Sequence, residues 1–559
     1  MDDTPSGNLL LYAGDERRPI ADEAVSSADA GAMRRPDDTA KLGNLLSDRD
    51  HIDDLAKQRW GVIAPEGPEG DRLIEAMRPL LERRREQCGL KEDIVYRVPP
   101  GQDASEAIAW RKRHFATGIE FRDDLPRYQL ILGDLHQVSA DLQAVQSIDG
   151  LVGRVAFDRL DDYAAYAAKV LASEGKVVAG ERRMILHTVH DGSAATQVGH
   201  RELIEPSRRL LERQRQRSAD LRDVALVVSG SDDPTPDELY AEACRDDPAV
   251  LFSVSHGEGA GRRGWSSAET QRLLQGRMVF GPYAEAIDRE ALSSGKFIPG
   301  GLWLMFACFS AGTPASSKFE RWLRELNMSK RDVAEALRSL PAAGERPFVA
   351  ALPKAALLNP EGPIAFVGHV DLAWTYSFRP IEGDKAQSRP ARFGELVRAA
   401  ITGSRVGVAF RELYGLFTEI DSELASLELN PKATASRRGH LWMLRQDLAG
   451  FMLLGDPAAR LPGLAAAPAA KPAAKPVEQR QSLFGVFGFD VVDGGGASQR
   501  AAPRRLTLAE LERAVSRVLA GEGAAAVARS QGVDAETLTR QVDRYIEAGR
   551  RALRDAGDV

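Results

Sequence analysis

Short apolar runs that alternate with amphipathic segments constrain this chain more than any other sequence feature. The alternation begins at Trp60, where WGVIAP precedes GDRLIEAMRPLLERRREQ (70–87), a segment with helical spacing. Such alternation with short connections favours a parallel sheet covered by helices. The runs AVLFSVSHGEG (249–259) and GGLWLMFACFSAG (300–312) are almost continuously apolar, as expected of strands buried on both faces. The sequence therefore predicts an α/β fold with a mostly parallel sheet flanked by helices.

The remaining elements follow the same pattern. Further predicted strands are DIVYRVPP (93–100), YQLILGD (128–134), VGRVAF (152–157), RMILHTVHDG (183–192), DVALVVSG (223–230) and GPIAFVGHVDLAW (362–374). Helices are predicted over 105–115, 160–175, 202–218 and 236–246. Region 390–460 is predicted to be mostly helical, because Leu413, Leu416, Phe417 and Ile420 fall on one helical face.

Length and composition shifts suggest how the chain divides. A chain of 559 residues has room for about three to four units. We predict a polar, partly disordered lead-in at 1–55, an α/β region at 56–460, an Ala/Pro/Gly-rich linker with a short apolar segment at 461–503, and a small all-α module at 504–559. Within the α/β region we distinguish an upstream subdomain at 56–180, a second subdomain at 181–385 and a helical extension at 386–460.

Composition excludes several classes of function. The net charge of −7 argues against a chain-wide basic surface for nucleic acid or anionic lipid. Three cysteines without CxxC spacing form neither a disulfide framework nor a metal site, so we expect no metal or cofactor and a reducing, cytoplasmic location. The N-terminus does not read as a signal peptide. The apolar run Leu302–Phe309 is too short for a membrane helix, so we expect no membrane segment.

Two apolar strands end in side chains that can do chemistry. One run leads into His256 and Gly257, and the other ends in Ala307 and Cys308. Because the carboxyl ends of parallel strands line the functional crevice of such sheets, we expect His256 and Cys308 to lie near each other. A thiolate can attack a carbonyl, an imidazole can activate the thiol, and the N–H groups of Gly257 and Cys308 can hold the developing oxyanion.

The two blocks resemble the signature of the caspase-like (clan CD) cysteine peptidases. A hydrophobic block ending in His-Gly precedes a hydrophobic block ending in Ala-Cys by some fifty residues. Upstream, YQLILGDLHQV (128–138) and VGRVAFDRLDDYAAYAAKVLASEG (152–175) resemble the first half of a gingipain-type catalytic unit. The resemblance covers residues 60–380. It implies a caspase-hemoglobinase-like fold and a cysteine endopeptidase that cleaves a protein or peptide substrate without a cofactor.

The resemblance also implies roles for individual residues. His256 matches the catalytic histidine, Cys308 the nucleophile, and Gly257 the glycine whose amide serves the oxyanion hole. The segment GPIAFVGHVDLAWTYSF (362–378) resembles the border of the primary specificity pocket, with Trp374 as a wall and Asp371 as a polar pocket residue. Asp191 stands where an acidic group could orient the histidine or line the pocket. Acidic pockets in this clan accept Arg or Lys, and the clan suggests a role in bacterial defence or regulated cell death.

Each of these residues also has an ordinary structural interpretation. A single cysteine at the end of an apolar strand is often a small buried hydrophobe, and a histidine there can simply be hydrogen-bonded. Asp371 and Asp191 suit turns, and Trp374 suits a core. The alternative hypotheses are therefore a catalytically inactive scaffold or sensor with a peptidase fold, and a transcription regulator with an α/β ligand-sensing body.

The last segment of the chain forms a separate predicted module. Residues 505–521 have one apolar helical face, and 523–549 predict a short helix, a tight turn and a longer helix that Asp534 can cap. This pattern resembles a helix-turn-helix, whose second helix would expose Glu536, Thr537, Thr539, Arg540 and Arg544 to DNA. Residues 501–559 carry ten arginines and nine acidic residues, a net charge of +1, so a protein partner is the other interpretation.

Overall fold

The structure, a computed structural model, divides into two compact units, Met1–Ala473 and Ala474–Val559. The residues that it describes are 6–20, 24–26, 52–115, 125–148, 150–176, 181–282, 286–287, 289–293, 295–325, 329–342, 344–379, 388–428, 434–463 and 527. The predicted linker beyond residue 463 and, apart from Val527, the predicted helix-turn-helix-like module at 504–559 lie outside the described residues.

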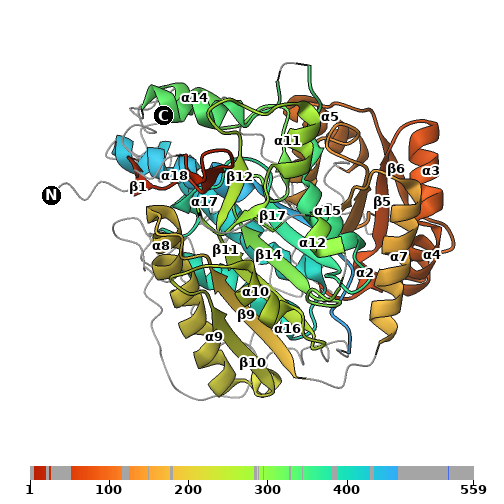
Figure 1. Ribbon diagram of the computed structural model, residues 1–559. Helices are drawn as coiled ribbons and strands as arrows, with labels where there is room; N and C mark the ends of the chain where they lie inside the picture. The colour runs from red at the N-terminus through yellow and green to blue at the C-terminus, as the bar shows by residue number, and fades with distance from the viewer. Residues whose placement is uncertain are drawn as a thin grey trace, which may run out of the picture. The chain divides into compact units, whose positions relative to one another are not determined.

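A ten-stranded sheet forms the centre of the first unit (Figure 1). Its order is β10-β9-β11-β14-β17-β18-β8-β7-β5-β6. The strands are β5 (Trp60–Pro65), β6 (Val95–Val98), β7 (Tyr128–Leu132), β8 (Leu151–Val155), β9 (Arg182–Thr188), β10 (Val224–Ser229), β11 (Ala249–Val254), β14 (Leu302–Phe306), β17 (Ala365–His369) and β18 (Phe451–Gly455). Neighbouring strands are parallel except β17 and β18, so two parallel halves run in opposite directions. The predicted α/β fold with a mostly parallel sheet is confirmed.

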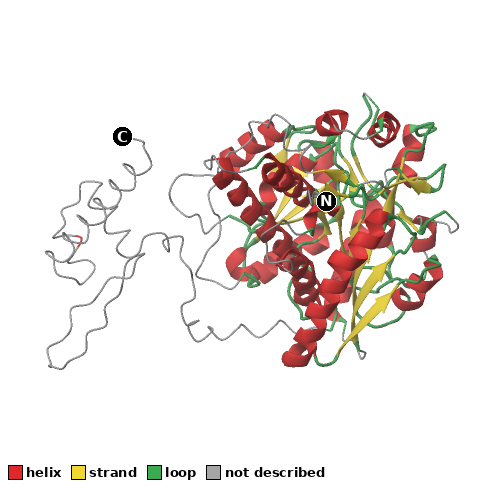
Figure 2. Ribbon diagram, turned by 90° about the vertical axis from the view of Figure 1, so that its left-hand side faces the viewer, coloured by secondary structure: helices red, strands yellow, loops and turns green. Residues whose placement is uncertain are grey.

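Helices cover both faces of this sheet (Figure 2). They are α2 (Leu55–Gln58), α3 (Pro68–Ala76), α4 (Arg78–Cys88), α5 (Ala104–His114), α6 (Ala140–Ser147), α7 (Leu160–Gly175), α8 (Ala194–Gly199), α9 (Glu205–Arg217), α10 (Pro236–Ala243), α11 (Ala268–Leu274), α12 (Arg289–Ser293), α13 (Glu320–Glu325), α14 (Lys330–Arg338), α15 (Ala351–Leu358), α16 (Ser388–Ile401), α17 (Val406–Glu428) and α18 (Ala435–Ala449). One packed group contains α3, α4, α7, α12 and α15, and another contains α9, α16, α17 and α18. Among the described residues, no helix is long and apolar enough to cross a membrane.

Two elements differ from the sequence-based expectation. The segment 70–87 forms two helices rather than one, because Pro79 has no N–H to donate to the preceding turn and the chain breaks at Met77. The predicted helical extension at 386–460 also contains β18, which lies between β17 and β8 near the middle of the sheet. A short apolar run such as FMLLG has no periodicity that separates a strand from a buried helix.

Part of the segment 1–55, predicted as a polar and partly disordered lead-in, is buried and belongs to a sheet. Residues 9–13 are fully buried, and Leu11–Ala13 forms β2 in a second, four-stranded sheet. The order of this sheet is β13-β12-β2-β3, with β13 at Met278–Val279, β12 at His256–Gly259 and β3 at Arg18–Pro19. The apolar run NLLLY carries enough surface to be buried even though its neighbours in the sequence are polar. Short pairs β1 (Ser6–Gly7) with β4 (Val25–Ser26) and β15 (Gly312–Thr313) with β16 (Phe348–Val349) complete the strands.

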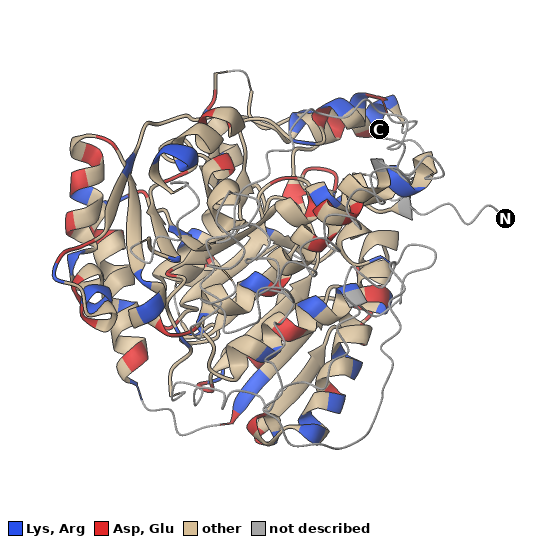
Figure 3. Cartoon of the chain, turned by 180° about the vertical axis from the view of Figure 1, so that it is seen from behind, with Lys and Arg blue, Asp and Glu red and all other residues tan. Residues whose placement is uncertain are grey.

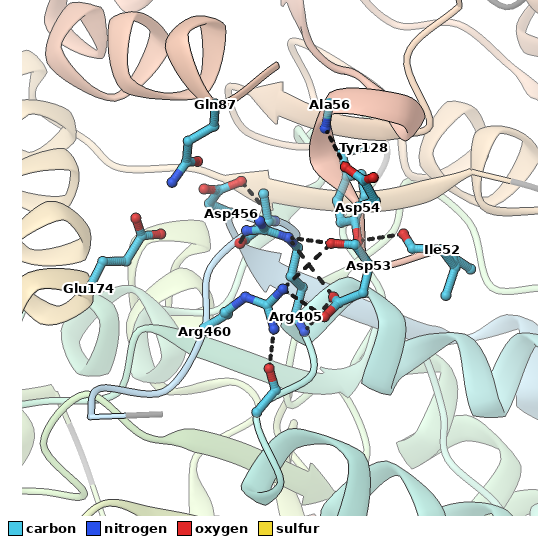
Figure 4. A network of polar contacts seen from close by, with 12 residues as sticks. Ile52, Asp53, Asp54, Ala56, Gln87, Tyr128, Glu174, Arg405, Asp456 and Arg460 are labelled. Atoms are coloured by element: carbon cyan, nitrogen blue, oxygen red, sulfur yellow. Dashed lines mark hydrogen bonds and ion pairs between the residues drawn. The ribbon is translucent and has the colours of Figure 1, made fainter. Parts of the chain in front are cut away.

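Residues of both charge signs are interspersed along the outer helices seen from behind (Figure 3). A different arrangement lies inside, in what we call the arginine network: Arg84, Glu174, Asp456, Asp53, Arg405 and Arg460 (Figure 4). Nε of Arg84 donates to Oδ2 of Asp456 at 2.8 Å, and Nη2 of Arg460 lies 2.6 Å from Oδ2 of Asp53. The network joins α4, α7 and Asp53, two positions before α2, to the segments that precede α17 and follow β18.

Candidate active site

The sheet brings His256 and Cys308 to the same edge. Strands β11 and β14 are parallel neighbours with Val254 opposite Phe306, so each strand is followed two residues later by one of the two side chains. Ser255 donates its N–H to the carbonyl of Phe306 at 3.3 Å, which extends the pairing toward the site. Both side chains are fully buried. The structure therefore places the predicted histidine and cysteine at adjacent strand ends.

The His256 imidazole is held from the loop that follows β9. Its Nε2 lies 2.8 Å from Ser193 Oγ and 3.5 Å from Asp191 Oδ2. The other carboxylate oxygen of Asp191 accepts from the N–H of Ser193 at 3.1 Å and from the Thr196 hydroxyl at 2.7 Å. Because a carboxylate only accepts, Asp191 favours the tautomer with the proton on Nε2 and leaves Nδ1 to accept a proton. This arrangement orients the imidazole.

Local sequence explains why the loop takes this shape. Ser193 is the N-cap of α8, with an extended backbone and its hydroxyl accepting from the N–H of Thr196 at 3.4 Å. The same hydroxyl contacts His256, so one serine both caps a helix and positions the imidazole. Sequence reasoning did not identify Ser193 as a site residue. Its signal was the Asp-Gly-Ser-x-x-Thr stretch, which resembles ordinary turn and cap chemistry.

The Cys308 sulfur lies against the backbone of Ala373. Ala373 donates its N–H to Sγ at 3.1 Å, and the thiol is 3.5 Å from the Ala373 carbonyl. Burial raises the pKa of the Cys308 thiol well above its ordinary value, although the Ala373 N–H favours the thiolate. The thiol is therefore protonated in this conformation. A nucleophilic role requires that water or a base reach the site.

Two backbone N–H groups converge on one point beside this thiol. The N–H groups of Gly257 and Cys308, which we call the amide pair, both donate to the carbonyl oxygen of Leu10, at 3.1 Å and 3.3 Å. A Cβ at Gly257 would stand 1.9 Å from the Cys308 carbonyl oxygen, so only glycine lets the two segments approach this closely. Two converging donors are the arrangement that stabilises an oxyanion.

Asp371 and Trp374, the two predicted pocket residues after β17, are buried and contact other parts of the chain. One oxygen of Asp371 accepts from the N–H of Leu372 at 2.7 Å, and the other from the N–H of Lys318 at 2.9 Å. Burial raises the pKa of Asp371 to about 6. Trp374 is fully buried, and its ring packs edge-on against Trp322 with centroids 5.0 Å apart.

Asp447 of α18 supports this stretch of backbone, and sequence reasoning missed it. Its two carboxylate oxygens accept from the N–H of Trp374 at 2.8 Å and of Ser377 at 3.0 Å. No local motif marks Asp447, because its partners lie about seventy residues away in the sequence. The helix that carries it thus shapes the wall of the site.

The described residues hold no group of three or more His, Cys, Asp and Glu side chains that could bind a metal ion. His187, His190 and His200 are close in sequence but serve local contacts. His187 Nδ1 lies 2.8 Å from Ser229 Oγ, and the rings of His190 and His200 lie 4.7 Å apart. The site is thus an arrangement of thiol, imidazole, carboxylate and amides.

Comparison with known proteins gives structural likenesses only. No protein-family model matches the chain, and no curated protein matches it. A solved structure described as a protease has a TM-score of 0.42 and 11% identity, covering 75% of this chain and 80% of that one. The Arg-specific cysteine proteinase gingipain R has a TM-score of 0.40 and 12% identity, covering 73% and 79%. A complex of the pro- and mature domains of RgpB from Porphyromonas gingivalis has a TM-score of 0.39 and 14% identity, covering 73% and 80%. We therefore base the proposals below on this chain's own residues.

Proposed function

We propose that this protein is a cysteine endopeptidase in which Cys308 is the nucleophile and His256 the general acid and base. The observation that carries this proposal is the convergence of the amide pair on one carbonyl oxygen beside a thiol, with an oriented imidazole on the neighbouring strand end. Each part has a role in acyl transfer, and the parts come from separate segments of the chain. Chance packing rarely supplies all of them at one sheet edge.

The reaction follows from these positions. His256 takes the thiol proton, and the Cys308 sulfur attacks the carbonyl carbon of the substrate peptide bond. The amide pair holds the negative oxygen of the tetrahedral intermediate. His256 then gives its proton to the leaving amine, the C–N bond breaks, and a thioester remains. Water, deprotonated by His256, hydrolyses the thioester to a carboxylate and restores the thiol.

Asp191 and Ser193 act through His256 as positioning residues. Their contacts to Nε2 fix the ring so that Nδ1 accepts the proton, and the Asp191 carboxylate stabilises the imidazolium that forms. The preference for Arg or Lys that the family resemblance suggested stays a prediction: both oxygens of Asp371 accept from backbone N–H groups, and Oδ2 of Asp191 lies 3.5 Å from Nε2 of His256. A cytoplasmic role in defence or cell death stays a prediction from resemblance.

The test compares the wild type with two cysteine variants on a peptide library that varies the residue before the scissile bond. Cys308→Ala should lower hydrolysis about 10⁴-fold or more, since the nucleophile is lost. Cys244→Ala is the matched control, because Cys244 is exposed at the end of α10, before the start of β11, whereas the site follows the other end of that strand; this variant should hydrolyse peptides like the wild type. Measurable hydrolysis that is equally fast in Cys308→Ala and in the wild type would refute the proposal.

A second candidate function is a non-catalytic scaffold with a peptidase-like sheet. The buried, protonated thiol of Cys308 favours it, because such a thiol is a poor nucleophile. Labelling by iodoacetamide separates the two. A scaffold should label at Cys308 slowly under every condition, whereas an enzyme should have a form in which Cys308 labels faster than Cys88 and Cys244.

A further inference from the structure

The segment Asn8–Ala13, which we call the blocking segment, crosses the candidate active site. Its Leu10 carbonyl is the group that the amide pair holds, at 3.1 Å from the Gly257 nitrogen and 3.3 Å from the Cys308 nitrogen. The carbonyl therefore occupies the position in which the proposed reaction needs the substrate carbonyl.

The residues before this carbonyl pair with the strand-like stretch after β17. Leu10 donates its N–H to the Ala373 carbonyl at 3.1 Å, and Leu9 forms an antiparallel bridge with Trp374. Asn8 accepts from the N–H of Thr375 at 3.1 Å. These contacts involve backbone groups, so they would hold any extended peptide in the same register, in the manner of an added β-strand.

The residues after the carbonyl are fixed in the small sheet. Strand β2 pairs in parallel with β12, with Leu11 opposite Gly257 and Ala13 opposite Gly259. The following turn leads into β3, where Arg18 forms an ion pair of 2.6 Å with the fully buried carboxylate of Glu335 on α14. The blocking segment is thus anchored downstream by a hairpin and upstream by backbone pairing, which favours a bound over an open state.

The side chain at the central position identifies the chemistry that the site accepts. Leu10 is 0% exposed, as are Leu9 and Leu11 on either side. A leucine that is fully buried where the residue before the scissile bond would lie shows that this position can enclose an aliphatic side chain. A pocket for Arg or Lys would need a carboxylate, but Asp371 accepts from two backbone N–H groups, and Asp191 faces the His256 imidazole with Oδ2 at 3.5 Å from Nε2.

We propose that the blocking segment inhibits the site in cis as a bound substrate analogue, and that the opened site selects peptides with an aliphatic residue such as leucine before the scissile bond. The second half of this proposal rests on the proposed peptidase function, but the first half does not. The segment excludes water from Cys308 and occupies the amide pair, so a substrate peptide must displace it. Release of residues 1–10 would expose the candidate active site while leaving the β2–β3 hairpin in place.

The blocking role is tested by the rate at which iodoacetamide labels Cys308, followed by peptide mass spectrometry. The proteins are the full chain, a Leu10→Asp variant, and a variant that lacks residues 1–10. Both changes should accelerate labelling of Cys308 at least about 10-fold, because burial of a charge or loss of the segment opens the site. Arg17→Asn is the control, since Arg17 is exposed in the hairpin turn with a left-handed backbone that asparagine tolerates. Equal labelling in all four proteins would overturn the proposal.

The expected selectivity is tested without turnover. Two tetrapeptide aldehydes, Gly-Asn-Leu-Leu-al and Gly-Asn-Leu-Arg-al, are offered to the variant that lacks residues 1–10. The Cys308 sulfur adds to the aldehyde carbon and the thiol proton passes to its oxygen, so a reversible hemithioacetal forms and protects Cys308 from iodoacetamide. The leucine aldehyde should protect at a concentration at least about 10-fold lower, because a buried guanidinium without a carboxylate partner is unfavourable. Equal or better protection by the arginine aldehyde would overturn the aliphatic preference.

These measurements separate the two proposals. Fast labelling and selective protection without any peptide hydrolysis would refute the peptidase but leave the blocking segment supported. Hydrolysis by the full chain at the same rate as by the shortened variant would refute the blocking segment but support the peptidase. Thermal unfolding of each variant shows whether Leu10→Asp folds. If it does not fold, the labelling rate of Cys308 in the variant that lacks residues 1–10 tests the blocking role.

Discussion

The arginine network and the candidate active site are both buried and polar, but they differ in the charge state that burial leaves. The network holds a charged guanidinium, whereas the site holds a neutral thiol. In the network, Arg84 and Asp456 are both 0% exposed and contact each other, and Glu174 adds a second carboxylate. Burial disfavours the charged guanidinium, but Asp456 and Glu174 raise the pKa of Arg84 overall. In the site, burial keeps the Cys308 thiol neutral, and no cation faces it in the contacts that the structure gives.

The contrast shows that buried polar groups within one unit can serve two purposes. Some contribute to stability, and others are available for reaction. A buried charge that meets an opposite charge is fixed in one state, and removing its partner is costly. A buried group that is neutral but close to a base can change state when a ligand or water enters. The network should therefore respond to mutation through stability, and the site through reactivity. The following predictions test this division, starting with the largest effect.

Removal of Asp456 should give the largest loss of stability. Asp456→Ala leaves the buried Arg84 with Glu174 and the neutral Gln87 as partners, and deprives the Trp60 indole N–H of its acceptor at 3.0 Å. The free energy of unfolding in urea should fall by about 3–5 kcal/mol. Glu174→Ala, whose carboxylate is 15% exposed, should cost less. If Asp456→Ala lost under 1 kcal/mol, the network would not be a stabilising element.

Asp191→Asn should show the opposite behaviour. The amide can donate to Nε2 of His256 and so favour the wrong tautomer, while its oxygen can still accept from Ser193. We expect kcat/KM of the variant lacking residues 1–10 to fall roughly 10³-fold, mainly through kcat, with a small change in unfolding free energy. A loss confined to KM, or a stability loss as large as that of Asp456→Ala, would remove the positioning role.

The pH dependence of stability should report on Asp371. Its folded pKa of about 6 lies above the ordinary value of 3.8 for an aspartate, so the folded state binds more protons between these two pH values. The stabilisation is complete below about pH 3.8 and is lost as the pH rises through 6, with a slope of at most about 1.4 kcal/mol per pH unit. Asp371→Asn should flatten this slope in urea titrations between pH 4 and 6. If the slope were unchanged, the dependence of the unfolding free energy on pH would come from groups other than Asp371.

A surface ion pair should give the smallest effect and calibrate the others. Arg324 and Glu320 lie 2.7 Å apart on α13 with side chains 60% and 38% exposed. Arg324→Ala should change the unfolding free energy by no more than about 0.5 kcal/mol, because an exposed i,i+4 pair is screened by solvent. A loss above 2 kcal/mol would mean that pairing alone, rather than burial, governs the stability contributed by charges in this protein.

The features predictable from sequence are those that local pattern determines. Continuous apolar runs predict β11 and β14, and the ends of these strands predict that His256, Cys308 and Gly257 are neighbours. The features that escaped prediction depend on distant partners. Strand β18 follows a helix as a short apolar run, and Leu10 meets residues more than 240 positions away. The spacing of apolar residues in the sequence predicts neither the pairing of β18 in the sheet nor the contact of Leu10 with the amide pair.

The antiparallel junction of β17 and β18 determines when the large sheet can be completed during synthesis. A ribosome makes β18 after every other strand of the large sheet, and α18, which carries Asp447, only just before it. Until then the emerging chain has two separate parallel half-sheets, and Trp374 and Ser377 lack the carboxylate that holds their backbone. The groove beside Cys308 is therefore finished only when residue 455 has left the ribosome, so a prematurely terminated chain carries the thiol and the imidazole without the wall that would present a peptide to them.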